Sequence, residues 1–213
     1  MNSRKLLGFL TGSFTAVLLL SGSNIFAQTA DNAEPAIATT APVADAKSEM
    51  MAKFQEYATP GDNQKVLDAF AGSWDYTLKM WMSAQATAEE STGSDEAKWI
   101  LGGRFLQHTS TGTSMGQPFE GIGMIGFDNK RKEYQSIWID NMSTGMMTGK
   151  GRFDPETKII TESGDFTCPL KGASVYRAVI RLLGPDNYSY EMYMLGDDSK
   201  EFKAMEINYT RKK

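Results

Sequence analysis

Residues 74–80, Trp-Asp-Tyr-Thr-Leu-Lys-Met, decide the fold class of this 213-residue chain. Apolar side chains occupy every second position of the stretch, namely Trp74, Tyr76, Leu78 and Met80, and polar side chains fill the positions between them. Successive side chains of a β-strand point to opposite faces of the sheet. A period of two therefore predicts a strand with one apolar face and one polar face.

The same pattern continues almost to the C-terminus. Further extended runs lie near residues 91–100, 104–112, 119–127, 133–141, 145–153, 158–166, 174–183, 188–195 and 201–211. Turn-forming residues such as Asp154-Pro155-Glu156 connect them. About ten strands with short connections predict a mainly β, antiparallel up-and-down arrangement, because no connection has room for the helix of a parallel crossover. Closure into a barrel removes unpaired edges, so we favour a barrel over the alternative, a β-sandwich.

Upstream of the strands, the sequence predicts one or two short helices. Apolar residues at helical spacing run from Met50 to Tyr57, and Pro60-Gly61 ends this run. A second short helix is expected over residues 63–70, with Asp62 as its N-cap. Residues 50–72 are thus a helical lead-in, and residues 73–213 form the barrel domain.

The N-terminal segment has the features of a secretory signal peptide. Arg4 and Lys5 precede an apolar run from Leu6 to Leu20, and cleavage is expected after Ala27. The alternative is an uncleaved anchor, but polar residues interrupt the run, so we expect no stable membrane span after signal removal. Residues 28–49 are rich in Ala, Thr and Pro and predict a disordered leader. The expected location is the periplasm or the extracellular space.

Composition excludes several classes of function. The chain has 22 basic and 26 acidic residues, a formal net charge of −4, which argues against a nucleic-acid-binding protein. Its single cysteine, Cys168, is expected to be a free, partly buried thiol and excludes an internal disulfide. Its single histidine, His108, excludes sites with two imidazoles, and we expect it at the surface or hydrogen-bonded in the core. The sequence predicts no metal site, no cofactor and no catalytic residue.

Several ordered blocks resemble a bacterial family known only as domain-of-unknown-function family 1579. The resemblance runs from about Thr59 to Arg211 and rests on residues 101–105 (LGGRF), 116–121 (GQPFEG), 126–129 (GFDN), 138–145 (WIDNMSTG) and 202–211 (FKAMEINYTR). It implies a calycin-like barrel, related in shape to lipocalins and fatty-acid-binding proteins, and implies no activity. Members of the family often carry a histidine where this chain has Gln64.

A barrel of this kind suggests that the chain binds a small apolar or amphipathic molecule. The expected lining consists of apolar and aromatic residues, Trp74, Tyr76, Met80, Trp138, Met192 and Met194. Arg104 or Asp140 would hold the polar end of the ligand, and the planar guanidinium of Arg104 would suit a carboxylate.

Alternatives remain open at these positions. Asp140 and Asn141 could line the mouth of the barrel, or they could bond to the backbone of a hairpin turn, which we favour. Arg104 could instead pair with Glu206 or Asp140 as structural support. An enzyme would need acidic residues, such as Asp140 with Glu206, for acid–base chemistry. A third hypothesis is a structural or interaction barrel filled by its own side chains.

Overall fold

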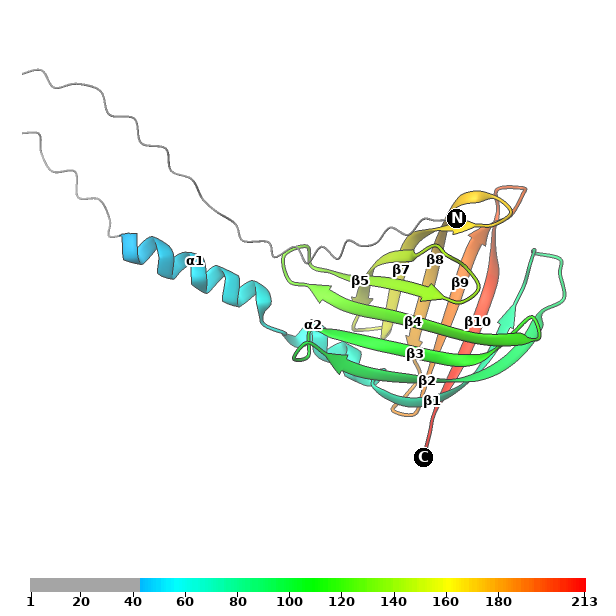
Figure 1. Cartoon of the computed structure of the whole chain (residues 1–213), viewed down its shortest axis with the longest axis horizontal. Helices are drawn as coiled ribbons and strands as arrows, with labels where there is room; N and C mark the ends of the chain where they lie inside the picture. The colour runs from blue at the N-terminus through cyan, green and yellow to red at the C-terminus, as the bar shows by residue number, and fades with distance from the viewer. Residues whose placement is uncertain (1–42) are drawn as a thin grey trace, which may run out of the picture. The chain divides into compact units, whose positions relative to one another are not determined.

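The computed structural model describes residues 43–213, in which ten strands form a closed antiparallel barrel (Figure 1). Each strand pairs with its neighbours in the chain, and β1 closes the barrel on β10. The strands are β1 Gly72–Met80, β2 Glu89–Ile100, β3 Phe105–Ser114, β4 Gln117–Asp128, β5 Glu133–Asp140, β6 Met147–Asp154, β7 Ile159–Cys168, β8 Gly172–Leu182, β9 Asn187–Leu195 and β10 Glu201–Arg211. The predicted up-and-down barrel is therefore confirmed, and the β-sandwich is excluded.

The helices differ from the sequence prediction in their bounds. Helix α1 spans Val43–Ala58 and so takes in the last part of the leader predicted over residues 28–49. Alanines and long charged side chains are good helix formers, and an exposed Lys53–Glu49 ion pair links successive turns. The predicted signal peptide and the rest of the leader lie outside the described residues. No helix in the described part of the chain is long and apolar enough to cross a membrane.

The second short helix starts one residue earlier than predicted. Helix α2 spans Asp62–Lys65 and continues into the 3₁₀ turn η1, Val66–Ala69. Gly61, rather than Asp62, is the N-cap residue, and its N–H donates to Oε1 of Gln64 at 2.7 Å. The buried Gln64 side chain also donates to the Phe127 carbonyl at 3.1 Å. This glutamine thereby ties the helical lead-in to the end of β4.

Residues of α2 and η1 close one end of the barrel. The hydrophobic core at this end consists of buried side chains, namely Leu67, Phe70, Trp74, Ala97, Leu106, Tyr134, Ile160 and Tyr188. The Trp74 Nε1–H donates to the Phe70 carbonyl at 2.8 Å. Arg211 stacks over the Trp74 ring, 4.0 Å from its centroid, and donates to the carbonyls of Ala69 and Ala71. Trp74 is therefore enclosed from every side at the closed end.

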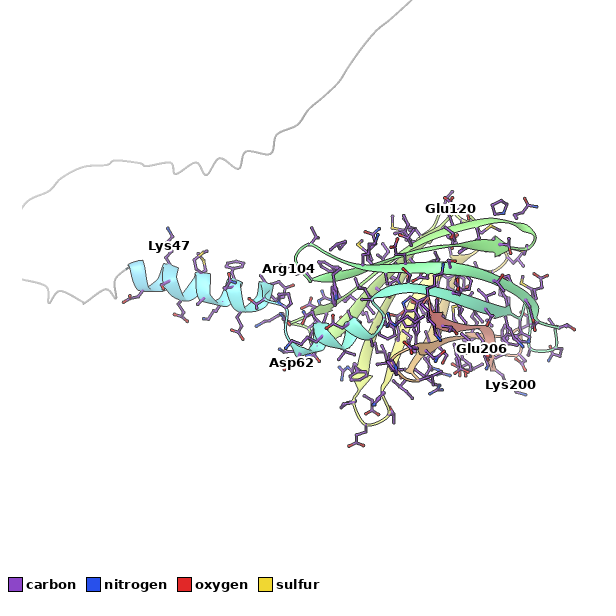
Figure 2. All side chains as sticks on the ribbon, turned by 90° about the horizontal axis from the view of Figure 1, so that it is seen from below. Lys47, Asp62, Arg104, Glu120, Lys200 and Glu206 are labelled. Carbon is purple, nitrogen blue, oxygen red and sulfur yellow. The ribbon has the colours of Figure 1, made fainter. Side chains whose placement is uncertain are left out.

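The opposite end of the barrel is less tightly packed. Inward-facing side chains there are only half-buried, among them Phe119, Trp138, Met147, Phe166, Met194 and Phe202. The connections at this end also expose apolar side chains, namely Met82, Met115, Met142, Met146 and Leu170. Figure 2 shows the two ends, with Asp62 and Arg104 at the closed end and Lys200 at the other. We call the half of the interior between the closed-end core and these connections the lumen.

Candidate binding site in the barrel interior

The lumen contains a histidine–carboxylate pair in which the carboxylate is buried and the imidazole is partly exposed. His108 on β3 and Asp95 on β2 both point inward, and His108 Nδ1 lies 2.9 Å from Asp95 Oδ2. Ser110, also on β3, donates its hydroxyl proton to the other oxygen of Asp95. Because an ionised carboxylate only accepts hydrogen bonds, the pair places the imidazole proton on Nδ1 and leaves Nε2 directed away from Asp95. The expectation of a hydrogen-bonded histidine is confirmed.

The free nitrogen of this histidine is accessible inside the barrel. The His108 side chain is 20% exposed, whereas that of Asp95 is 2% exposed. Among residues 43–213, no buried side-chain nitrogen or oxygen lacks a hydrogen-bond partner. His108 Nε2 makes no side-chain hydrogen bond to a described residue, and it belongs to a partly exposed side chain. His108 Nε2 thus remains available as a polar atom inside the barrel.

A second polar network lies on the wall formed by β5, β7 and β8. Buried Glu162 accepts hydrogen bonds from the Tyr176 hydroxyl at 2.6 Å and from the Ser136 hydroxyl at 2.8 Å. Burial raises the pKa of Glu162 above its ordinary value, although these two hydrogen bonds oppose the shift. Burial likewise raises the pKa of Tyr176 and of Tyr190, and the nearby Glu162 adds to both shifts. The lumen therefore favours neutral over anionic side chains.

Replacing Glu162 with glutamine should change how stability depends on pH. Folding raises the pKa of Glu162 above 4.5, its value in the unfolded chain. The protonated side chain therefore makes its whole contribution to the free energy of unfolding below pH 4.5, and this contribution is lost as pH rises through the folded pKa. The amide introduced by E162Q stays neutral, so the stability of this variant relative to wild type should increase between pH 4.5 and pH 8. Urea unfolding at both pH values measures this change.

Glu206→Gln is the matched control for this titration. Hydrogen bonding to Lys203 lowers the pKa of Glu206, so its contribution is present above the unfolded value of 4.5 and is lost at acid pH. E206Q should therefore lose stability relative to wild type as pH rises from about 3 to about 6, the opposite sign, and urea unfolding at these two pH values measures the change. Equal slopes for the two variants would contradict our assignment of Glu162 as a desolvated carboxyl.

The structure places most of the predicted apolar lining on the inner face. Tyr76 is buried and donates to the Thr111 carbonyl at 3.3 Å. Met192 packs with Tyr176, Ala178 and Ala204 in a second buried cluster, and Met194 packs against it. Met80 is half-buried at the open end of β1. Trp74, in contrast, belongs to the closed-end core and has no surface in the lumen.

Trp138 lies flat against the wall of the lumen. The edge of its ring covers Gly121 and Gly123 of the neighbouring strand, where any larger side chain would collide with it. Trp138 stacks with Phe119 at a centroid distance of 6.3 Å. Its Nε1–H donates to Asp140 Oδ2 at 2.9 Å. Trp138 is thus held in one orientation with its ring along the inner wall.

Asp140 and Asn141 serve mainly to hold the hairpin together. Asp140 also accepts from the N–H of Met142 at 3.0 Å, and Asn141 bonds to the backbone of Glu120 and Pro118 across the turn. The turn-stabilising alternative favoured for this block is the one that the structure shows. Asp140 remains partly accessible at the open end.

Two predicted site residues lie away from the lumen. Arg104 is exposed at the closed end, where it donates to the carbonyls of Leu101 and Gly102 and so holds a tight turn outside the lumen. Glu206 is on the outer face of β10 and pairs with Lys203 at 2.5 Å. Asp140 and Glu206 are on strands that are five positions apart around the barrel. The structure therefore does not bring together the acidic pair that an acid–base enzyme would need.

Several inward-facing polar residues were not singled out in the sequence. Among them are Asp95, Ser110, Ser136, Glu162 and Tyr190. The alternation of side chains along each strand could have indicated them. Asp95 lies on the same face of its strand as Ala97 and Trp99, and Glu162 lies on the same face as Ile160. A polar residue in an otherwise apolar phase indicates a polar group inside the barrel. In the described residues, no group of three His, Cys, Asp or Glu side chains could hold a metal ion.

The outer wall has a separate hollow of about 840 Å³ over β5–β9. Arg177 lies there over the Tyr193 ring at 4.2 Å and makes two hydrogen bonds to Glu201, at 2.9 and 2.5 Å. Arg181 pairs with Glu191 at 3.2 Å on the same outer face. Both arginines thus face outward, and their charges are balanced by neighbouring carboxylates.

Comparison with known proteins supports the fold. The crystal structure of Rv2717c from M. tuberculosis matches with a TM-score of 0.53 and 14% sequence identity. The match covers 73% of this chain and 100% of the Rv2717c chain. The S-type phycobiliprotein lyase CPES from Guillardia theta matches over 71% of this chain and 93% of its own, with a TM-score of 0.52 and 10% identity. At these identities the similarity concerns the fold alone. No curated protein sequence matches the chain significantly.

The sequence itself matches one family model, described as a protein of unknown function, over residues 59–211. This range includes α2, η1 and all ten strands. Since the match covers well over half of the chain, the protein belongs to the DUF1579 family.

Proposed function

We propose that this protein is an exported barrel that binds a small apolar or amphipathic molecule in its lumen. The observation that carries the proposal is the partly exposed His108 on the inner face of the barrel, held by Asp95. Trp138 and His108 both lie against Gly123, and Met192, Met194 and Tyr190 pack together on another part of the inner wall. An apolar cavity with a few well-placed polar groups is the usual composition of a small-molecule site.

The two halves of the interior support binding over a purely structural barrel. At the closed end, side chains such as Leu67, Trp74 and Leu106 are fully buried. In the lumen, Asp95 and Glu162 are buried carboxyls, which are costly to remove from water and give little stability in return. A barrel that needed only a stable core would gain from apolar residues at these positions.

The export part of the proposal rests on residues 1–27. The full sequence should be expressed in a bacterium and the periplasmic fraction isolated. An intact mass that corresponds to a chain beginning at Gln28 supports cleavage after Ala27. A full-length chain found only in the cytoplasm or the membrane contradicts export.

Native mass spectrometry on this purified protein, prepared without detergent, tests ligand binding directly. An adduct that disappears on denaturation supports a bound molecule, and its mass gives the chemical class. The neutral dye N-phenyl-1-naphthylamine, whose fluorescence rises in apolar surroundings, provides a second measurement. The absence of both an adduct and dye binding contradicts the proposal and favours a filled structural barrel.

Removing the Trp138 ring should weaken ligand binding. In Trp138→Ala, the ligand loses an aromatic wall and Gly121 and Gly123 are left uncovered, so the affinity for N-phenyl-1-naphthylamine should fall by about ten-fold or more. Tyr193→Ala is the matched control, because it removes an aromatic ring from the outer face. Fluorescence titration measures both affinities. An equal loss in the two variants would place the dye outside the lumen.

A further inference from the structure

The cations of the barrel strands are placed almost entirely outside. Ion pairs on the outer face hold Lys79 with Glu90, Lys98 with Glu96, Arg177 with Glu201, Arg181 with Glu191 and Lys203 with Glu206. Among the described strands, Arg211 is the inward-facing exception. It lies over Trp74 in the closed end and is held by the Ala69 and Ala71 carbonyls. The lumen therefore lacks a lysine or arginine from these strands.

Carboxyl groups, in contrast, line the inside. Asp95 and Glu162 are buried on opposite walls, since β2 and β7 are five strands apart around the barrel. Asp140 adds a third carboxyl at the open end, next to the Trp138 ring. A ligand carboxylate in this space would have no lysine or arginine to pair with, and the burial that raises the pKa of Glu162 would disfavour a further anion there as well.

The orientation of His108 gives the lumen a defined hydrogen-bond acceptor. Asp95 Oδ2 fixes the proton on Nδ1 at 2.9 Å, and Ser110 holds Asp95 in turn. With its proton on Nδ1, the imidazole presents the lone pair of Nε2 to the lumen.

We propose that the lumen selects amphipathic ligands whose polar end is an amine or another N–H donor, and that His108, positioned by Asp95, binds this end. The inference rests on the proposed function and names the ligand class of that site. It replaces the carboxylate expected from Arg104, since that arginine lies in a closed-end turn. The apolar part of the ligand would lie against Trp138 and Met194.

The test compares two probes that share one alkyl chain, decylamine and decanoate. Each displaces N-phenyl-1-naphthylamine from the purified, exported protein at pH 8, below its micelle concentration. Because the tails are identical, the ratio of the two displacement constants reports the head group. Decylamine should bind at least about ten-fold more tightly than decanoate, which is about 1.4 kcal/mol.

Three variants locate the origin of this preference. His108→Leu removes the acceptor and should reduce the preference for decylamine to about three-fold or less. His108→Gln retains an acceptor and should keep most of the preference, which separates recognition from a loss of shape. Glu206→Gln removes a carboxylate from the outer wall and should leave the ratio unchanged. Circular dichroism melting checks that each variant is folded.

The outcomes distinguish this inference from the proposed function. If the dye binds and decanoate displaces it as well as decylamine does, the inference is overturned while ligand binding stands. Retention of the full ratio in His108→Leu, or its loss in Glu206→Gln, also overturns the role of His108. If neither the dye nor either probe binds, the proposed function fails and the inference fails with it.

Discussion

Replacing Trp74 with alanine should destabilise the barrel by about 3–5 kcal/mol, the range for removal of a large aromatic side chain from a core. Trp74 has no exposed surface, and its ring meets Tyr188 edge-on at a centroid distance of 4.7 Å. The substitution also leaves the Phe70 carbonyl without its donor and removes the ring under Arg211. Three elements, η1, β1 and β10, lose a common contact, so the cost should exceed that of a simple cavity.

Urea unfolding followed by far-UV circular dichroism measures this loss. Phe54→Ala is the matched control, because it truncates an aromatic ring that is 62% exposed on α1. Its effect should be less than about 0.5 kcal/mol. A loss below about 1 kcal/mol in Trp74→Ala would show that the closed end is not the stable core of the barrel.

Strand alternation predicted much of the inner face because the period of two is strict within a strand. In β1, residues Trp74, Tyr76 and Met80 take the inward phase that the sequence indicated. The sequence could not divide these residues between the closed-end core and the lumen. This division depends on α2 and η1, which enter one end and cover Trp74 but not Met80.

Glu206 shows where alternation fails. A bulge at Lys203–Met205 inserts one extra residue into β10, so Met205 pairs with the inward-facing Met192. Without the bulge, Glu206 would share the inner face with Phe202. With it, Glu206 turns outward to Lys203. An extra residue moves every later side chain of the strand to the opposite face of the sheet. The position of the bulge is set by the pairing of β10 with β9, and the sequence of β10 alone does not contain this information.

The histidine–carboxylate pair was hidden for a related reason. His108 and Asp95 are on different strands, and the register that pairs His108 with Ala97 and Ser110 with Asp95 brings them together. Their sequence separation carries no information about this contact. Arg104 was expected at the start of the strand predicted over residues 104–112, whereas residues 101–104 form a turn with Leu101, Gly102 and Gly103 at positive φ.

Inward-facing glycines are the signal in the sequence that most directly reflects how the lumen is built. Large side chains lie across them: Tyr76 over Gly93 and Gly112, Trp138 over Gly121 and Gly123, and Tyr176 over Gly164. The absence of a Cβ lets each ring lie flat against the wall rather than project into the centre of the barrel. The glycines therefore maintain the close packing of the rings against the inner wall.

Gly164→Ala should accordingly destabilise the protein by about 3 kcal/mol, the upper part of the range for overpacking. A Cβ at this position would overlap the Thr148 carbonyl oxygen and would lie 2.8 Å from the Tyr176 ring. Because the first of these atoms is backbone, β6 and β7 must separate, and Tyr176 must shift from its hydrogen bond to Glu162. Gly145→Ala makes the same change in an exposed loop, where the nearest atom is 3.9 Å away, and should cost less than about 0.5 kcal/mol. Urea unfolding of both variants measures the effect, and dye titration of folded Gly164→Ala protein measures binding. Equal stabilities of the two variants would mean that the strands tolerate the methyl group and that the lumen wall does not require this glycine.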